Sequence, residues 1–112
     1  MRILVLPGDG IGPEITDAVL QILDAAKAPL SYEIFNVGAA EYERHGALIP
    51  DDAFASFEKT HLLLKSPITT PIGKGFRSLN VTLRNKYDLY ANIRPAKSNT
   101  AVKTPFPNVD IV

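Results

Sequence analysis

The side chains best suited to bind an anion lie on one predicted helix. Arg77, Asn80 and Arg84 are spaced so that on a helix they fall within roughly 60° of one another, because each residue turns the chain by about 100°. Leu79 and Leu83 fall on a different face. Guanidinium and amide groups gathered on one face can hold a carboxylate or a phosphate through several hydrogen bonds.

Two further residues could complete this site. Ser78 stands at the predicted helix start, near peptide N–H groups that have no partner within the helix. Arg94 ends the strand predicted next, and α/β proteins commonly bind ligands at strand ends. The alternative is a solvated basic helix face plus one surface arginine. Residue types alone favour that alternative.

Two loops contain glycines that permit close backbone approach. The turn Gly8–Gly12 lies between a predicted strand and a predicted helix, where N–H groups can meet an anion. Its spacing is G-x-G-x-G instead of the G-x-G-x-x-G of dinucleotide-binding turns, which favours a tight turn over a phosphate site. The loop 66–75 carries the hydroxyls of Thr69 and Thr70 and suits either a ligand-gripping loop or an ordinary connection.

Strand and helix patterns alternate along the chain, which predicts an α/β fold: a layered parallel or mixed sheet with flanking helices. Continuous apolar runs predict buried strands, and spacings of three and four predict helices with one apolar stripe. The stripe of the first helix is Ile15, Ala18, Val19, Ile22, Leu23 and Ala26. The predicted strands are 2–6, 31–37, 61–65, 88–94 and a beginning at 109–112; the predicted helices are 13–27, 39–46, one from Asp51 or Asp52, and 78–86.

Residues 1–112 are predicted to be one segment without an internal boundary. The apolar residues 109–112 look like the start of a strand, whereas domain boundaries usually fall in polar linkers. We therefore expect the domain to continue past residue 112.

Composition excludes several classes of protein. Hydrophobic residues make up 46% of the 112 residues and charged residues 21%, which argues against intrinsic disorder. The absence of cysteine excludes a disulfide scaffold and a cysteine-based zinc site. No apolar run approaches the ~20 residues of a membrane helix, and the first run is too short for a signal peptide. We expect a cytoplasmic protein, or a mitochondrial matrix protein in a eukaryote.

The net charge of zero hides an uneven distribution. Residues 1–64 carry a net charge of −6, residues 65–103 of +7 and residues 104–112 of −1. A basic segment in a neutral chain indicates a local anion site, since nucleic-acid-binding domains are usually basic throughout. A small anion- or nucleic-acid-binding domain that uses residues 65–103 remains an alternative.

Specific stretches along the chain resemble the N-terminal part of the isocitrate/isopropylmalate dehydrogenase family. Gly8–Glu14 is similar to the family's opening turn. Lys65–Pro71 resembles its substrate-proximal loop, with Ser66 where a glycine is common. Asp88–Pro95 resembles the strand that carries a substrate arginine, and its sequence is most similar to NAD-dependent isocitrate or homoisocitrate enzymes.

The stretch Arg77–Arg84 discriminates between branches of this family. It resembles the isocitrate branch, because the isopropylmalate branch has apolar residues where Ser78 and Asn80 stand. By this resemblance Ser78 and Asn80 hold the distal carboxylate of the substrate, and Arg84 and Arg94 hold the carboxylates near the reacting carbon. Thr69 would lie beside the nicotinamide.

The resemblance also implies a reaction and its cofactors. A 2-hydroxy acid, most simply isocitrate in the tricarboxylic acid cycle, is oxidised by NAD or NADP and then decarboxylated to 2-oxoglutarate. Mg²⁺ or Mn²⁺ polarises the hydroxyl and then the keto oxygen. The general acid, the general base and the metal ligands would lie outside this chain, so we expect no catalytic residue and no metal ligand within it.

Three expectations about the whole protein follow. The 112-residue chain alone should be inactive, and the full-length form should be a homodimer or larger oligomer, with no nucleic-acid or membrane partner. A non-catalytic, carboxylate-binding or regulatory relative is the alternative of another class. Homoisocitrate dehydrogenase is the alternative within the same class.

Overall fold

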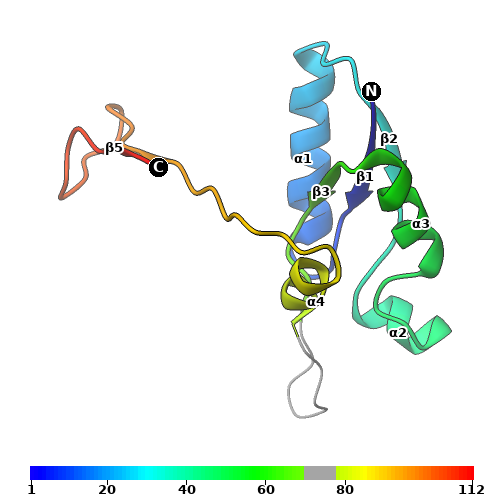
Figure 1. Cartoon of the computed structure of the whole chain (residues 1–112). Helices are drawn as coiled ribbons and strands as arrows, with labels where there is room; N and C mark the ends of the chain where they lie inside the picture. Colours follow the sequence, from blue (N-terminus) through cyan, green and yellow to red (C-terminus); the bar gives the residue numbers. More distant parts are fainter. Residues whose placement is uncertain (70–77) are drawn as a thin grey trace. The chain divides into compact units, whose positions relative to one another are not determined.

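The computed structural model describes residues 1–69 and 78–112 (Figure 1). They form two compact units, Met1–Leu79 and Asn80–Val112. The first unit is an α/β layer structure, as the alternating patterns predict. The predicted fold class is therefore confirmed.

The first unit contains a parallel sheet of three strands in the order β2–β1–β3. The strands are β1 (Arg2–Leu6), β2 (Ser31–Ile34) and β3 (Leu63–Lys65). Leu4 to Leu6 of β1 are the largest fully buried side chains among the described residues, at 2% exposure or less. A continuous apolar run suits this central strand, because helices cover both faces of a parallel sheet.

Helices lie on both faces of the sheet (Figure 1). The chain passes from β1 to β2 through α1 (Gly12–Ala25), and from β2 across to β3 through α2 (Ala39–His45) and α3 (Asp51–Thr60). The two crossovers run in opposite directions along the sheet, so the right-handed rule places α1 on one face and α3 on the other.

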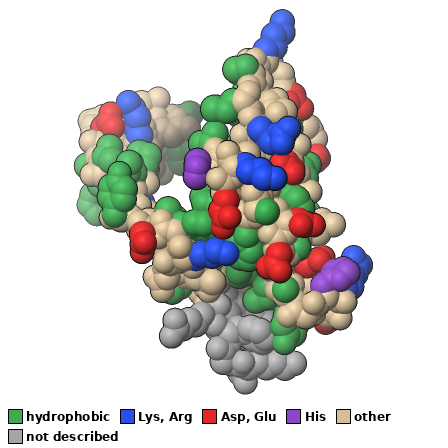
Figure 2. Space-filling model, turned by 45° about the vertical axis from the view of Figure 1, so that its right-hand side comes forward, with side chains coloured by type: hydrophobic (Ala, Val, Ile, Leu, Met, Phe, Trp, Pro, Cys, Tyr) green, Lys and Arg blue, Asp and Glu red, His purple; other side chains and the backbone are tan. Residues whose placement is uncertain are grey.

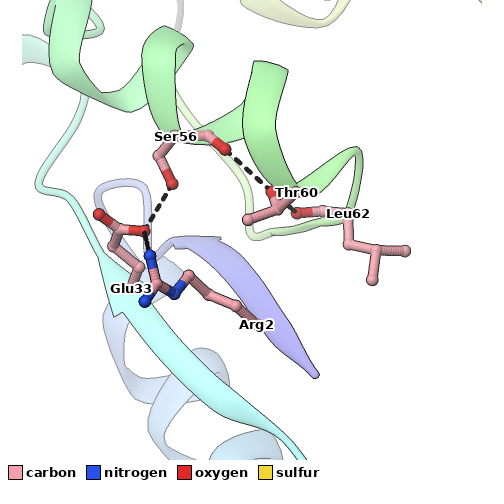
Figure 3. A network of polar contacts seen from close by, with 5 residues as sticks. All are labelled: Arg2, Glu33, Ser56, Thr60 and Leu62. Atoms are coloured by element: carbon pink, nitrogen blue, oxygen red, sulfur yellow. Dashed lines mark hydrogen bonds and ion pairs between the residues drawn. The ribbon is translucent and has the colours of Figure 1, made fainter.

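A polar network fixes α3 against the edge of the sheet (Figure 3). The Ser56 hydroxyl, which is 5% exposed, donates a hydrogen bond to Glu33 Oε2 on β2 at 2.8 Å. Arg2 Nη1 on β1 lies 4.0 Å from the same oxygen. The Thr60 hydroxyl shares its proton between the carbonyl oxygens of Ser56, at 3.1 Å, and Leu62, at 3.3 Å. This network closes the end of α3 onto the segment that enters β3.

The covered face of α1 differs from the predicted stripe. Ile15 and Ile22 are exposed, at 42% and 67%, whereas Gly12 and Thr16 are buried. Val19 and Leu23 from the predicted stripe are half-buried, so only part of that stripe is covered. The first turn of α1 approaches another backbone segment closely, which selects small residues on its covered side.

The helix α4 (Leu79–Lys86) begins at the last residue of the first unit, and the rest of it belongs to the second. The second unit also contains an antiparallel pair of strands, β4 (Ala96–Lys97) and β5 (Asp110–Ile111). Leu79 and Leu83 of α4 are both buried, as their spacing predicts. Lys97 Nζ lies 2.9 Å from Asp110 Oδ2 across the β4–β5 pair. The predicted strand start at 109–112 thus forms a short strand.

The predicted strand 88–94 is wrong. Asp88 adopts a left-handed conformation with φ of 46° as α4 ends, and residues 89–95 contain no sheet structure. Leu89, Tyr90 and Ile93 are exposed, at 53%, 99% and 77%. Alternating apolar residues form a strand only where a neighbouring strand pairs with their peptide groups, and none does so among the described residues.

Charges of both signs are interspersed on the face of the molecule seen in Figure 2. Within the described residues, no helix has the length and apolar character needed to cross a bilayer.

Candidate functional site

The glycine-rich turn after β1 receives the backbone of the segment that follows β3. The Asp9 N–H donates to the Pro67 carbonyl oxygen at 3.2 Å, and the Ser66 N–H donates to the Leu6 carbonyl oxygen at 3.0 Å. A Cβ atom on Gly8 would overlap that Pro67 oxygen. A peptide carbonyl therefore faces the turn where a phosphate would otherwise approach, in line with the tight turn that the glycine spacing favours.

Two hydroxyls join α1 to the same segment. The Thr16 side chain is 4% exposed, its hydroxyl donates to the Gly12 carbonyl oxygen at 2.9 Å, and its oxygen lies 2.6 Å from Ser66 Oγ. The pair fixes the end of β3 relative to the first turn of α1.

Asp9 completes the attachment of this segment. Its Oδ1 accepts the Thr69 N–H at 2.6 Å, and its Oδ2 accepts the Ala39 N–H at 3.3 Å. Partial burial acts to raise the pKa of the Asp9 carboxyl. Hydrogen bonds from Thr69 and from the Ala39 N–H outweigh it and hold the pKa below the ordinary value of an aspartate. The carboxylate is therefore ionised at neutral pH.

Replacing Gly8 should destabilise the first unit strongly. Gly8 has a φ of 76°, so Gly8→Ala combines a left-handed residue with a steric overlap against the backbone at Pro67. The free energy of unfolding should fall by at least ~2 kcal/mol, measured by urea denaturation followed by circular dichroism.

Gly10→Ala is the matched control for this steric effect. Gly10 also has a positive φ, of 59°, but a Cβ there would meet nothing within 4 Å. Its loss should stay near ~1 kcal/mol, the cost of the conformation alone. Equal losses in the two variants would show that the Pro67 contact does not restrict Gly8.

The structure places Asn80 and Arg84 one turn apart on α4, and both are exposed. Ser78 is half-buried and directly precedes the helix. The predicted helical arrangement of these three residues is therefore present. Arg77 and Thr70 lie outside the described residues.

Arg94 lies in the exposed segment after α4 and not at the end of a strand. Among the described residues, no salt bridge involves Arg84 or Arg94. Thr69 belongs to the first unit, and Asn80, Arg84 and Arg94 belong to the second. The structure thus brings together the α4 residues and, separately, Thr69 with Asp9.

The described residues do not fit a divalent metal site. No group of three His, Cys, Asp or Glu side chains gathers within residues 1–69 and 78–112. Residues 70–77 contain none of these four residue types. A divalent ion prefers several carboxylate, imidazole or thiolate ligands, so this segment does not supply such a set.

Sequence reasoning missed two contacts that hold the segment after β3, those of Asp9 and of the Thr16–Ser66 pair. Asp9 meets Thr69 across 60 positions of sequence, and Thr16 meets Ser66 across 50. No local period reveals such pairs. The one available signal is the polar Thr16 on an otherwise apolar helix face.

Comparisons with known proteins show what this chain is similar to. The family model for isocitrate/isopropylmalate dehydrogenase matches residues 2–112. The NADP isocitrate dehydrogenase of Thermus thermophilus is 46% identical, over 98% of this chain and 23% of that protein. The alpha subunit of the human mitochondrial NAD isocitrate dehydrogenase is 47% identical, over 98% of this chain and 30% of that protein.

Solved structures give the same result. The crystal structure of isocitrate dehydrogenase from Methylococcus capsulatus matches with a TM-score of 0.91 and 40% identity, over 98% of this chain and 32% of that one. A beta-decarboxylating dehydrogenase from Thermococcus kodakarensis matches with a TM-score of 0.77 and 34% identity, over 87% and 30%. The chain spans a quarter to a third of the length of these relatives. The resemblance found in its motifs is confirmed: the chain belongs to the isocitrate/isopropylmalate dehydrogenase family.

Proposed function

We propose that this chain supplies the substrate-carboxylate side of a decarboxylating dehydrogenase that converts isocitrate to 2-oxoglutarate with NAD. NADP is the alternative cofactor, and relatives of both kinds are similar to this chain. The observation that carries the proposal is the pairing of Asn80 and Arg84 on an exposed face of α4, directly after Ser78.

The chemistry of these groups suits a tricarboxylate. The Ser78 hydroxyl and the Asn80 amide can donate hydrogen bonds to the distal carboxylate at a helix start, where peptide dipoles favour negative charge. Arg84 and Arg94 each offer a planar set of donors that can hold a carboxylate through two hydrogen bonds. Neither guanidinium is in a salt bridge within the described residues, so both charges are available to a ligand.

Thr69 is proposed to contact the nicotinamide. Its side chain is exposed at the end of a segment that Asp9 and Ser66 hold in place. Mg²⁺ or Mn²⁺, when bound by residues outside this segment, would polarise the substrate hydroxyl and then the keto oxygen. The residues of this chain bind and orient the substrate and the cofactor.

A chimeric enzyme tests the proposal. Residues 2–112 replace the matching segment of the Thermus thermophilus isocitrate dehydrogenase, to which they are 46% identical. We expect isocitrate-dependent reduction of a nicotinamide cofactor, measured at 340 nm with Mg²⁺ or Mn²⁺. Homoisocitrate is assayed in parallel and should be the poorer substrate. A folded chimera without turnover would favour the alternative of a non-catalytic, carboxylate-binding relative.

The 112-residue chain alone should show no turnover with isocitrate, Mg²⁺ or Mn²⁺ and either cofactor. The reaction needs a bound metal ion, a general acid and a general base. The described residues form no metal-ligand cluster, and the sequence predicts no acid–base pair in this chain. The purified 112-residue chain, of the correct mass, is assayed beside the chimera, which serves as the positive control. Cofactor reduction above background by the chain alone would contradict the prediction.

A further inference from the structure

Asp9 and Gly10 form the one Asp–Gly pair in the sequence, which contains no Asn–Gly pair. In such a pair the peptide nitrogen of the glycine can attack the side-chain carboxyl carbon, because the glycine has no side chain to obstruct the ring that forms. The pair lies in the turn after β1, where the Gly12 N–H donates to the Asp9 carbonyl oxygen at 2.9 Å. It is therefore the position in this chain where an aspartate can most readily rearrange.

Gly10 is accessible for this reaction. It is exposed, and a Cβ atom on it would meet nothing within 4 Å. Among the described residues, no hydrogen bond from the Gly10 N–H is found. Neither packing nor a hydrogen bond to these residues therefore restrains the attacking nitrogen.

The Asp9 carboxylate, in contrast, is held at both oxygens. Oδ1 accepts the Thr69 N–H at 2.6 Å, and Oδ2 accepts the Ala39 N–H at 3.3 Å. The side chain also lies close against Gly38, where a Cβ atom would come within 2.5 Å of Asp9 Oδ2. Ring formation removes one of the two oxygens, so it must break at least one of these hydrogen bonds.

We propose that Asp9–Gly10 is a site of isoaspartate formation, and that the N–H groups of Ala39 and Thr69 suppress the reaction while the first unit is folded. The Gly10 nitrogen bonds to Asp9 Cγ and gives up its proton, and one carboxyl oxygen leaves as water. Water then adds to the cyclic imide. Addition at Cγ restores aspartate, whereas addition at the main-chain carbonyl carbon gives isoaspartate. Neither step needs an oxidant, a metal or a cofactor, and the inference does not depend on the proposed function.

Isoaspartate at position 9 would not restore the native contacts. The main chain would run through the former side chain, which makes it one carbon longer, and the free carboxylate would sit on Cα. The native turn fits closely against Pro67, whose carbonyl oxygen accepts the Asp9 N–H at 3.2 Å and would overlap a Cβ on Gly8. The converted chain, separated by chromatography, should therefore unfold at a lower urea concentration than the unconverted chain.

The first experiment compares the folded 112-residue chain with the chain unfolded in urea, at neutral pH and one temperature. Isoaspartate at position 9 is measured by mass spectrometry of proteolytic peptides, and uptake of ¹⁸O from labelled water records the hydrolysis of the imide. The folded chain should convert at least about a hundredfold more slowly, because each of two hydrogen bonds to a charged acceptor is worth about tenfold. Equal rates would overturn the proposed protection.

Gly10→Ala tests the chemistry of the site. A side chain at position 10 hinders ring closure, so this variant should show little conversion even in urea. Unsuppressed conversion in unfolded Gly10→Ala, or no conversion of the unmutated chain in urea, would overturn the proposed site.

Ala39→Pro removes one of the two donors to Asp9. Ala39 is the first residue of α2, a position that proline favours, so the helix can keep its start while the N–H is lost. Conversion in the folded variant should be about tenfold faster than in the unmutated chain. Asp51→Pro makes the same change at the first residue of α3 and should leave the rate unaltered. Equal rates in the two proline variants would show that the Ala39 N–H does not protect Asp9.

Hydrogen exchange of the Ala39 and Thr69 amides provides a measurement that needs no variant. Urea at concentrations below the unfolding transition increases local opening of the folded chain. Conversion at Asp9 should speed up in proportion to the exchange of these two amides, because the reaction follows the population of the open form. A conversion rate that stays constant while both amides exchange faster would refute the proposed protection.

Discussion

Arg94→Ala in the chimera should lower kcat/KM for isocitrate by at least about 30-fold. The variant would leave a substrate carboxylate without its guanidinium partner, and losing such a charged contact costs ~2–5 kcal/mol. Each ~1.4 kcal/mol corresponds to tenfold in rate. The measurement is initial-rate kinetics with isocitrate, cofactor and Mg²⁺.

Folding should not be the cause of this loss. Arg94 is exposed, and among the described residues no salt bridge involves it, so its removal should change the free energy of unfolding by less than ~0.5 kcal/mol. Lys103→Ala removes another exposed cation of the same unit and serves as the matched control. Arg94→Lys should fall between the two, because an ammonium keeps the charge but cannot form the planar pair of hydrogen bonds. A fall in kcat/KM of less than about threefold in Arg94→Ala, under ~1 kcal/mol, would show that Arg94 does not touch the substrate.

The sequence predicts the elements of the first unit well where neighbouring residues alone determine the structure. The apolar run of β1 gives a central strand, and Gly46 ends α2 in a left-handed conformation with φ of 75°. The predicted covered face of α1 is wrong in part, because Ile15 and Ile22 are apolar yet exposed, while Thr16 is polar yet buried. Periodicity identifies the helix, but the backbone segment at Ser66 and Pro67 decides which face is covered.

In the candidate site too, local sequence patterns predict some contacts, and long-range packing decides the others. Asn80 and Arg84 are brought together by the helical period alone, so sequence spacing is sufficient. The position of Arg94 depends on sheet pairing, and residues 89–95 have no pairing strand among the described residues. The Asp9–Thr69 contact joins residues 60 positions apart and depends on the parallel register of β1 and β3. Contacts of this kind follow from topology, which single-sequence patterns do not specify.

Ser78→Asp should reduce kcat/KM for isocitrate in the chimera by at least ~100-fold while the protein stays folded. The substitution places a negative charge where the distal carboxylate of the substrate is proposed to bind. Two like charges about 4 Å apart repel by ~4 kcal/mol at an effective dielectric constant of about 20. Stability should change little, because Ser78 directly precedes α4 and aspartate is also a favoured residue at helix starts. Kinetics and a melting curve on the same preparation provide both measurements.

Ser78→Asn separates charge from shape in this test. Asparagine has nearly the size of aspartate and is an equally good helix cap, but it is neutral and can donate to a carboxylate. It should therefore retain activity within about tenfold of the unmutated chimera, a difference of one hydrogen bond. If Ser78 only caps α4, both variants should have near-normal kinetics and melting temperatures. If crowding at a half-buried position were responsible, the two variants would lose activity equally. Only repulsion of a bound carboxylate predicts a large loss for aspartate alone.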